Sequence, residues 1–158
     1  MIDGPETGDL YQARVTFRVE FADTDTQGRV YYANYFRYFD RARFAYWEAI
    51  GCDEAGVRRC EDETLLADVG AAYKAPVRFW EQVTVRCRVA RLGRSSLHTV
   101  YQVSAGPEGR PIAEGHETLV WFDPRTGRPV PIPEDIRRRI EAFEGTRLAP
   151  PEGGTRGG

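Results

Sequence analysis

Two carboxylates, Asp23 and Asp25, end the first predicted strand, and Gly28 and a predicted helix follow them directly. A helix N-terminus exposes unpaired N–H groups and carries about half a positive charge, which stabilises an oxygen that becomes negative in a transition state. Gly28 allows a ligand to approach the backbone closely. The spacing therefore predicts that the Asp25 carboxylate lies near a carbonyl group polarised by the backbone around Tyr32.

Aspartate is also a favoured residue in turns and at helix N-caps, so both carboxylates have a structural alternative. For Asp23 we expect that alternative, a turn hydrogen bond or an ion pair. A bare Asp-x-x-Gly would favour the same role for Asp25, but the longer motif described below favours catalysis.

The elements that position these residues follow from periodicity and from turn residues. Apolar and polar residues alternate over residues 14–21, as in a half-buried strand, and residues 32–50 contain no Pro or Gly before Gly51. A polar connection covers residues 52–63. Four more strands and a short amphipathic helix follow, at Leu65–Phe79, Val83–Leu92, Ser96–Ser104, Ile112–Phe122 and Glu134–Phe143.

These elements predict an α+β fold in which a curled antiparallel sheet of about five strands wraps around a long central helix, with a short C-terminal helix. The central helix is apolar around most of its circumference, and a five-stranded sheet leaves two edges unpaired. Pairing with a second copy would cover both, so we expect a homodimer or a dimer of dimers, a homotetramer.

The length, charge and cysteine content of the chain bound the number of domains and the kinds of partner and cofactor that we expect. The chain has 158 residues, consistent with one domain at 13–145 between disordered tails at 1–12 and 146–158. A net charge of −2 argues against nucleic acid and against an anionic membrane as partners, and no stretch predicts membrane insertion or a signal peptide. Three cysteines without zinc spacing suggest the reducing cytoplasm and predict neither a metal site nor a cofactor.

The segment from Asp25 to Tyr35, Asp-Thr-Gln-Gly-Arg-Val-Tyr-Tyr-Ala-Asn-Tyr, resembles a known signature. It is similar to the D-x-x-G-x-V-Y-Y-x-N-Y motif of hotdog-fold acyl-CoA thioesterases, in particular the 4-hydroxybenzoyl-CoA thioesterase family. The similarity extends over about residues 14–144. It implies a hotdog fold with its active site at a dimer interface.

The resemblance also implies roles for individual residues. Asp25 matches the catalytic carboxylate, as nucleophile or as the base that activates water, and the backbone N–H of Tyr32 matches the group that polarises the thioester carbonyl. One subgroup carries His at the position of Tyr32, so a His-assisted step is not expected here. The residues that match substrate-binding positions are Gly28, Val30, Tyr31, Asn34 and Tyr35.

A second candidate site is the turn after the third predicted strand. Arg91, Arg94 and Ser95 resemble a basic turn that some members of the family use against coenzyme A phosphates, and a solvated turn is the alternative. We interpret residues 137–139, three consecutive arginines, as a solvated helix face, and His98 and His116 as structural.

The resulting functional hypothesis is an acyl-CoA thioesterase that releases a free carboxylic acid and coenzyme A. Acyl carrier protein could replace coenzyme A, and the residues do not specify the acyl group. A non-catalytic hotdog module that binds acyl-CoA or an acyl carrier is the alternative from another functional class. A hotdog dehydratase is less consistent with the sequence, because such enzymes use a His and none lies near Asp25.

Overall fold

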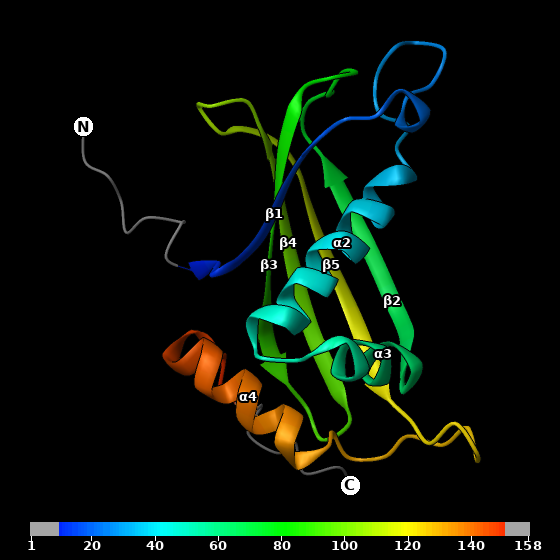
Figure 1. The fold of residues 1–158 in the computed structure, drawn as a ribbon, viewed down its shortest axis with the longest axis vertical. Helices are drawn as coiled ribbons and strands as arrows, with labels where there is room; N and C mark the ends of the chain where they lie inside the picture. Colours follow the sequence, from blue (N-terminus) through cyan, green and yellow to red (C-terminus); the bar gives the residue numbers. More distant parts are fainter. Residues whose placement is uncertain (1–9, 151–158) are drawn as a thin grey trace, which may run out of the picture.

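The computed structural model describes residues 10–150, and five strands form a single antiparallel sheet in the order β1-β3-β4-β5-β2 (Figure 1). The strands are β1 (Ala13–Arg18), β2 (Thr64–Tyr73), β3 (Gln82–Leu92), β4 (Ser96–Ala105) and β5 (Arg110–Trp121). The helices are α2 (Asn34–Ala49), α3 (Glu54–Asp62) and α4 (Glu134–Glu144), with 3-10 turns η1 (Phe21–Asp23) and η2 (Gly145–Arg147). The predicted five-stranded antiparallel sheet is confirmed.

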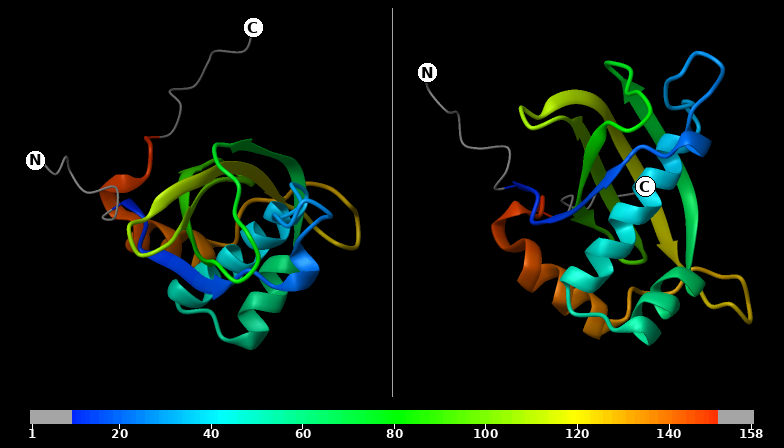
Figure 2. Two further views of the ribbon diagram at one scale, coloured as in Figure 1. Left: turned by 90° about the horizontal axis from the view of Figure 1, so that it is seen from above. Right: turned by 45° about the horizontal axis from the view of Figure 1, so that its top comes forward.

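Helix α2 lies along the concave side of the curled sheet (Figure 2). It has 16 residues and is shorter than the predicted 32–50, because its first regular turn begins at Asn34. The ring of Phe39 stacks on Tyr101 of β4 with centroids 4.5 Å apart. Gly115 of β5 makes room for this ring, since a Cβ there would lie 2.3 Å from Phe39 Cζ. Close packing on small residues thus sets the distance between helix and sheet.

A buried ion network also joins α2 to the sheet. The Arg43 guanidinium donates to both carboxylate oxygens of Glu117 on β5, at 3.2 and 3.1 Å, and to Glu61 of α3 at 2.9 Å. The hydroxyl of Tyr101 donates to the same Glu117 carboxylate. Removing one member would leave the others buried and unpaired, so the network specifies how α2, α3 and β5 meet.

Residues 52–63 contain α3 and are not simply the polar connection that we expected. The Asp53 side chain caps the helix by accepting the N–H of Gly56 at 2.8 Å. In the described helix only Cys60 is fully buried. The helix has only nine residues, fewer than the about 11 to 18 over which helical periodicity can be recognised, which explains why the pattern missed it.

The first strand also ends earlier than its alternating pattern predicts. Strand β1 stops at Arg18, and Phe21, predicted to be part of a half-buried strand, is 76% exposed. The reason is local: the chain enters a 3-10 turn in which the Asp23 side chain accepts the Glu20 N–H at 3.0 Å. The segment beyond β1 therefore leaves the sheet and starts the loop that carries Asp25.

The C-terminal segment covers part of the outer edge of β3. Strand β1 pairs with β3 only as far as Cys87, and beyond this point the Val89 N–H donates to the buried carboxylate of Glu144 at 3.1 Å. The Ala149 N–H then donates to the Ala90 carbonyl at 2.8 Å. Of the predicted tails, residues 1–9 and 151–158 lie outside the described residues.

The pKa of Glu144 is raised above its ordinary value of 4.5 because burial disfavours the charged carboxylate. When the pKa of a carboxyl is higher in the folded state than in the unfolded state, the folded protein becomes less stable as the pH rises from the unfolded-state pKa through the folded-state pKa. We expect that Glu144→Gln, which keeps an acceptor for the Val89 N–H, removes this loss. Urea denaturation at several pH values above 4.5 should then show the variant gaining stability relative to the wild type. Parallel pH profiles would contradict it.

Candidate active site

A cavity of about 310 Å³ lies where the Asp25 loop, the first turn of α2 and the end of β2 meet. Four of the predicted site residues line it together: Asp25, Val30, Tyr32 and Tyr35. The remaining lining residues are Arg29, Tyr73, Lys74, Ala75 and Pro76. A carboxylate, three tyrosines and two cationic side chains therefore surround one space.

The loop holds Asp25 by short-range hydrogen bonds. One carboxylate oxygen, Oδ1, accepts the Gln27 N–H at 2.8 Å, and the Asp25 carbonyl accepts the Gly28 N–H at 3.0 Å. Gly28 has a φ of +74°, a conformation that glycine adopts without strain. The other oxygen, Oδ2, has no hydrogen-bond partner among residues 10–150 and is therefore available to a substrate or a water molecule.

The turn that leads into α2 carries a free amide at Tyr32, one of the residues that line this cavity. Tyr31 donates to the Asp23 carbonyl at 2.9 Å and Asn34 donates to the Tyr31 carbonyl at 2.9 Å, whereas the Ala33 N–H between them has no acceptor among residues 10–150. The N–H of Tyr32 has no acceptor within the described part of the chain. It lies at the positive end of the helix dipole, where an N–H group stabilises negative charge.

Asp23 connects the loop to the helix, as its expected structural role requires. Its buried carboxylate accepts the Tyr38 hydroxyl at 2.9 Å, and its carbonyl accepts the Asn34 side-chain amide at 2.8 Å. Asn34, predicted to bind substrate, therefore points to the loop and does not line the cavity. Gly28 and Tyr31 are also outside the lining, Gly28 as the turn residue and Tyr31 as an exposed ring 4.7 Å from Tyr32.

The three tyrosines form a connected wall. Tyr73 lies with its ring centroid 5.1 Å from Tyr35 and 6.4 Å from Tyr32, and its hydroxyl donates to the Tyr32 carbonyl at 2.9 Å. Burial raises the pKa of Tyr35 to about 12, so its hydroxyl stays neutral. The wall is thus aromatic, and the hydrogen bond of Tyr73 holds the turn that carries the Tyr32 amide.

The predicted basic turn lines a separate cavity of about 450 Å³ at the other end of the sheet. Arg91 and Arg94 share it with His98 and with Arg137 of α4. Arg137 donates to the Gly93 carbonyl at 2.6 Å, so it is not part of a simply solvated face as we expected. Ser95, the third residue predicted here, is not in the lining.

Sequence reasoning missed Arg29, Tyr73 and Lys74 in the Asp25 cavity and Arg137 in the basic one. Arg29 lies within the motif, so its position was a signal that could have been used. Tyr73 and Lys74 lie about fifty residues further along the chain and reach the cavity only through the pairing of β2 with β5. No local pattern carries that information.

Between residues 10 and 150, no three His, Cys, Asp or Glu side chains gather closely enough to hold a metal ion. None of the helices in the same range combines the length and apolarity that crossing a membrane requires.

Comparison with known proteins gives consistent matches. The family model described as the thioesterase-like superfamily matches residues 19–140. A solved thioesterase from Thermus thermophilus, complexed with coenzyme A and Zn, is 36% identical with a TM-score of 0.76, covering 87% of this chain and 97% of its own. A solved gentisyl-coenzyme A thioesterase is 28% identical with a TM-score of 0.68, and the match covers 80% of this chain and 98% of that chain. A protein from Aquifex aeolicus (strain VF5), named provisionally as an esterase, is 29% identical, covering 75% and 90%.

The link between loop and helix can be tested at Tyr38. We expect Tyr38→Phe to lower the free energy of unfolding by about 1–3 kcal/mol, because the buried Asp23 carboxylate loses a donor. Tyr35→Phe is the matched control, since Tyr35 lies on the same helix and its hydroxyl makes no hydrogen bond among residues 10–150. Urea denaturation measures both variants, and equal losses would show that the Asp23 bond contributes nothing specific.

Proposed function

The chain belongs to the thioesterase-like superfamily, and on this basis we propose that it hydrolyses an acyl-CoA thioester to a carboxylic acid and coenzyme A. The observation that carries the proposal is the placement of the Asp25 carboxylate and the free Tyr32 amide on one cavity. The solved relatives that hold coenzyme A or act on gentisyl-coenzyme A support coenzyme A as the thiol. The motif from Asp25 to Tyr35 further supports the 4-hydroxybenzoyl-CoA type within the superfamily.

Asp25 acts on the thioester carbonyl carbon in one of two ways. As a nucleophile, its free oxygen attacks that carbon, the C–S bond breaks and the thiolate leaves; water then hydrolyses the acyl-aspartyl anhydride, and one of the protons released passes to the thiolate. As a general base, Asp25 takes a proton from water while the water oxygen attacks, and the proton passes to the departing thiolate. Both routes yield one acid and one thiol and return Asp25 to its starting form.

The carbonyl oxygen becomes negative in either route and needs a donor in place before the reaction. The Tyr32 N–H meets this need because no residue in the described range uses it and because the α2 dipole adds positive potential. The peptide that carries the Tyr32 N–H is held by its own carbonyl, that of Tyr31, which accepts the Asn34 N–H, and Tyr73 holds the following peptide through the Tyr32 carbonyl. Stabilisation by a fixed amide requires no reorganisation during the reaction.

We expect Asp25→Asn to lower kcat by about 100-fold or more on any acyl-CoA that the wild type hydrolyses, because the variant lacks both nucleophile and base. Asp62→Asn, which changes an exposed carboxyl on α3, serves as the control. A thiol-release assay over short, long, branched and aromatic acyl-CoAs measures both. Undiminished turnover in a folded Asp25→Asn variant would remove Asp25 from the mechanism. A wild type that binds these esters without releasing thiol would select the non-catalytic binding module.

We further propose that the protein works as a homodimer that pairs through β2. This strand is at the end of the sheet order, and within the described residues its outer edge has no partner. It exposes Leu65 and Leu66, which are 50% and 54% accessible. Exposed apolar edge strands are templates for pairing with a second chain. Since Tyr73 ends this strand and lines the Asp25 cavity, such a pairing would bring the partner close to the site.

The pairing predicts that the double substitution Leu65→Asp and Leu66→Asp converts the dimer to a monomer, because like charges would face each other across the paired edges. Size-exclusion chromatography with light scattering gives the mass of both forms, and the calculated chain mass is 17.9 kDa. Circular dichroism checks that the variant remains folded. A folded variant that is still a dimer would place the interface elsewhere.

A further inference from the structure

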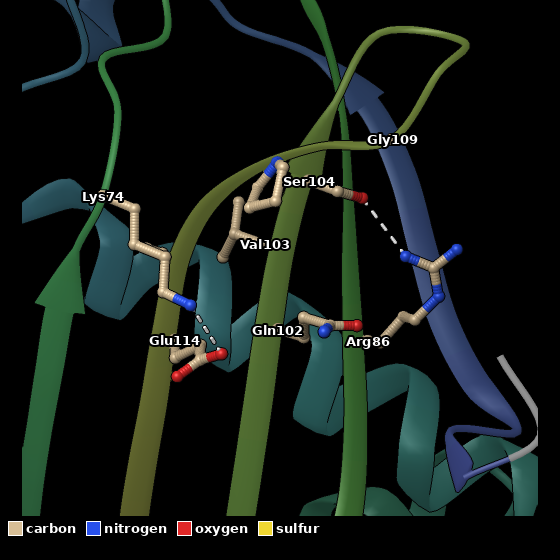
Figure 3. A pocket seen from close by; sticks show the side chains of 9 residues that line it. Lys74, Arg86, Gln102, Val103, Ser104, Gly109 and Glu114 are labelled. Atoms are coloured by element: carbon tan, nitrogen blue, oxygen red, sulfur yellow. Dashed lines mark hydrogen bonds and ion pairs between the residues drawn. The ribbon is translucent and has the colours of Figure 1, made fainter. Parts of the chain in front are cut away.

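A third cavity, of about 290 Å³, lies on the face of the sheet opposite α2, below the turn between β4 and β5 (Figure 3). Three neighbouring strands supply its polar side chains, Arg86 from β3, Gln102 from β4 and Glu114 from β5. Lys74, which follows β2, reaches over its rim. None of the functional residues predicted from the motif lies here.

Hydrogen-bond donors in this cavity outnumber the acceptors. Arg86 uses one Nη1–H to reach the Ser104 hydroxyl at 3.1 Å, and its other N–H groups have no acceptor among residues 10–150. The Gln102 amide also has no hydrogen-bond partner in that range. Lys74 neutralises Glu114 at 2.8 Å and retains two further N–H groups. The net positive charge is therefore that of Arg86, whose planar fork of donors suits a phosphate group.

Lys74 belongs to both the Asp25 cavity and this outer cavity, so the two are neighbours in one chain. The basic turn at Arg91 and Arg94 is not a neighbour of the Asp25 cavity. It follows the end of β3, whereas the Asp25 cavity is near the start of that strand, and 11 extended residues span about 33 Å. Within one protomer, a ligand that enters the Asp25 cavity therefore reaches Arg86 before it reaches the basic turn.

We infer that Arg86, with Gln102 and Lys74, binds the phosphate groups of the coenzyme A portion of the substrate while its thioester occupies the Asp25 cavity of the same chain. The inference rests on the proposed thioesterase function. The pantetheine arm of coenzyme A passes over Lys74 from the Asp25 cavity to the cavity at Arg86. Arg91 and Arg94 are then not required for a substrate bound by their own protomer.

The kinetic test compares an acyl-CoA with the same acyl group on pantetheine, which carries no phosphate. We expect Arg86→Ala to raise KM for the acyl-CoA by about tenfold or more, because a charge-assisted hydrogen bond is lost, and to leave kcat and the pantetheine ester unaffected. Arg58→Ala, which removes an exposed arginine on α3, is the matched control. Equal effects on both esters, no effect, or a selective effect of Arg94→Ala instead would overturn the inference.

A binding test works without turnover. Lys74 is the only lysine in the chain, so the modification of its amine by trinitrobenzenesulfonate can be followed by mass spectrometry of a single peptide. Free coenzyme A should protect Lys74 in the wild type and much less in Arg86→Ala, and pantetheine should not protect it. If the wild type hydrolyses neither ester, the proposed hydrolysis is refuted. If coenzyme A fails to protect Lys74, the phosphate site alone is refuted.

Discussion

The hydrogen bonds of Asp23 are the constraint on which the site depends, because they fix the Asp25 loop against the first turn of α2. Catalysis by a carboxylate and an amide requires both groups at a fixed separation, and errors of about 1 Å are costly. The loop alone could not provide that precision. By accepting from Tyr38 and from Asn34, Asp23 makes the loop part of the helix terminus. Asp23, two residues before the motif, thus has a structural role that supports the proposed chemical role of Asp25.

The position of α2 is in turn fixed by contacts that are far from the cavity. Phe39 stacks on Tyr101 above Gly115, and the buried Arg43–Glu117 pair allows little sliding of the helix along the sheet. Buried ion pairs contribute little net stability but penalise alternative arrangements strongly. The interior therefore provides a rigid platform, and the groups proposed to react lie at its end, where the strands stop and loops can approach a ligand.

The charges at the surface separate into two cationic cavities at opposite ends of β3. One adjoins the Asp25 cavity through Lys74, and the other lies between the β3–β4 turn and Arg137 of α4. A single chain can bring only the first near its own carboxylate. The cavity at Arg86 is therefore the one within reach of a substrate bound by the same protomer.

Local sequence patterns were enough to predict the alternating strands, the glycine turn and an Asp25-to-Tyr35 segment in which a carboxylate and a helix terminus lie within ten residues of each other. These follow from backbone preferences and short-range spacing, which a chain carries along its length. Only the tertiary structure placed Tyr73 and Lys74 at the same cavity, turned Asn34 toward Asp23, exposed Phe21 and brought Arg137 to the basic turn. Those outcomes depend on strand register and packing between segments distant in sequence, and no local pattern records them.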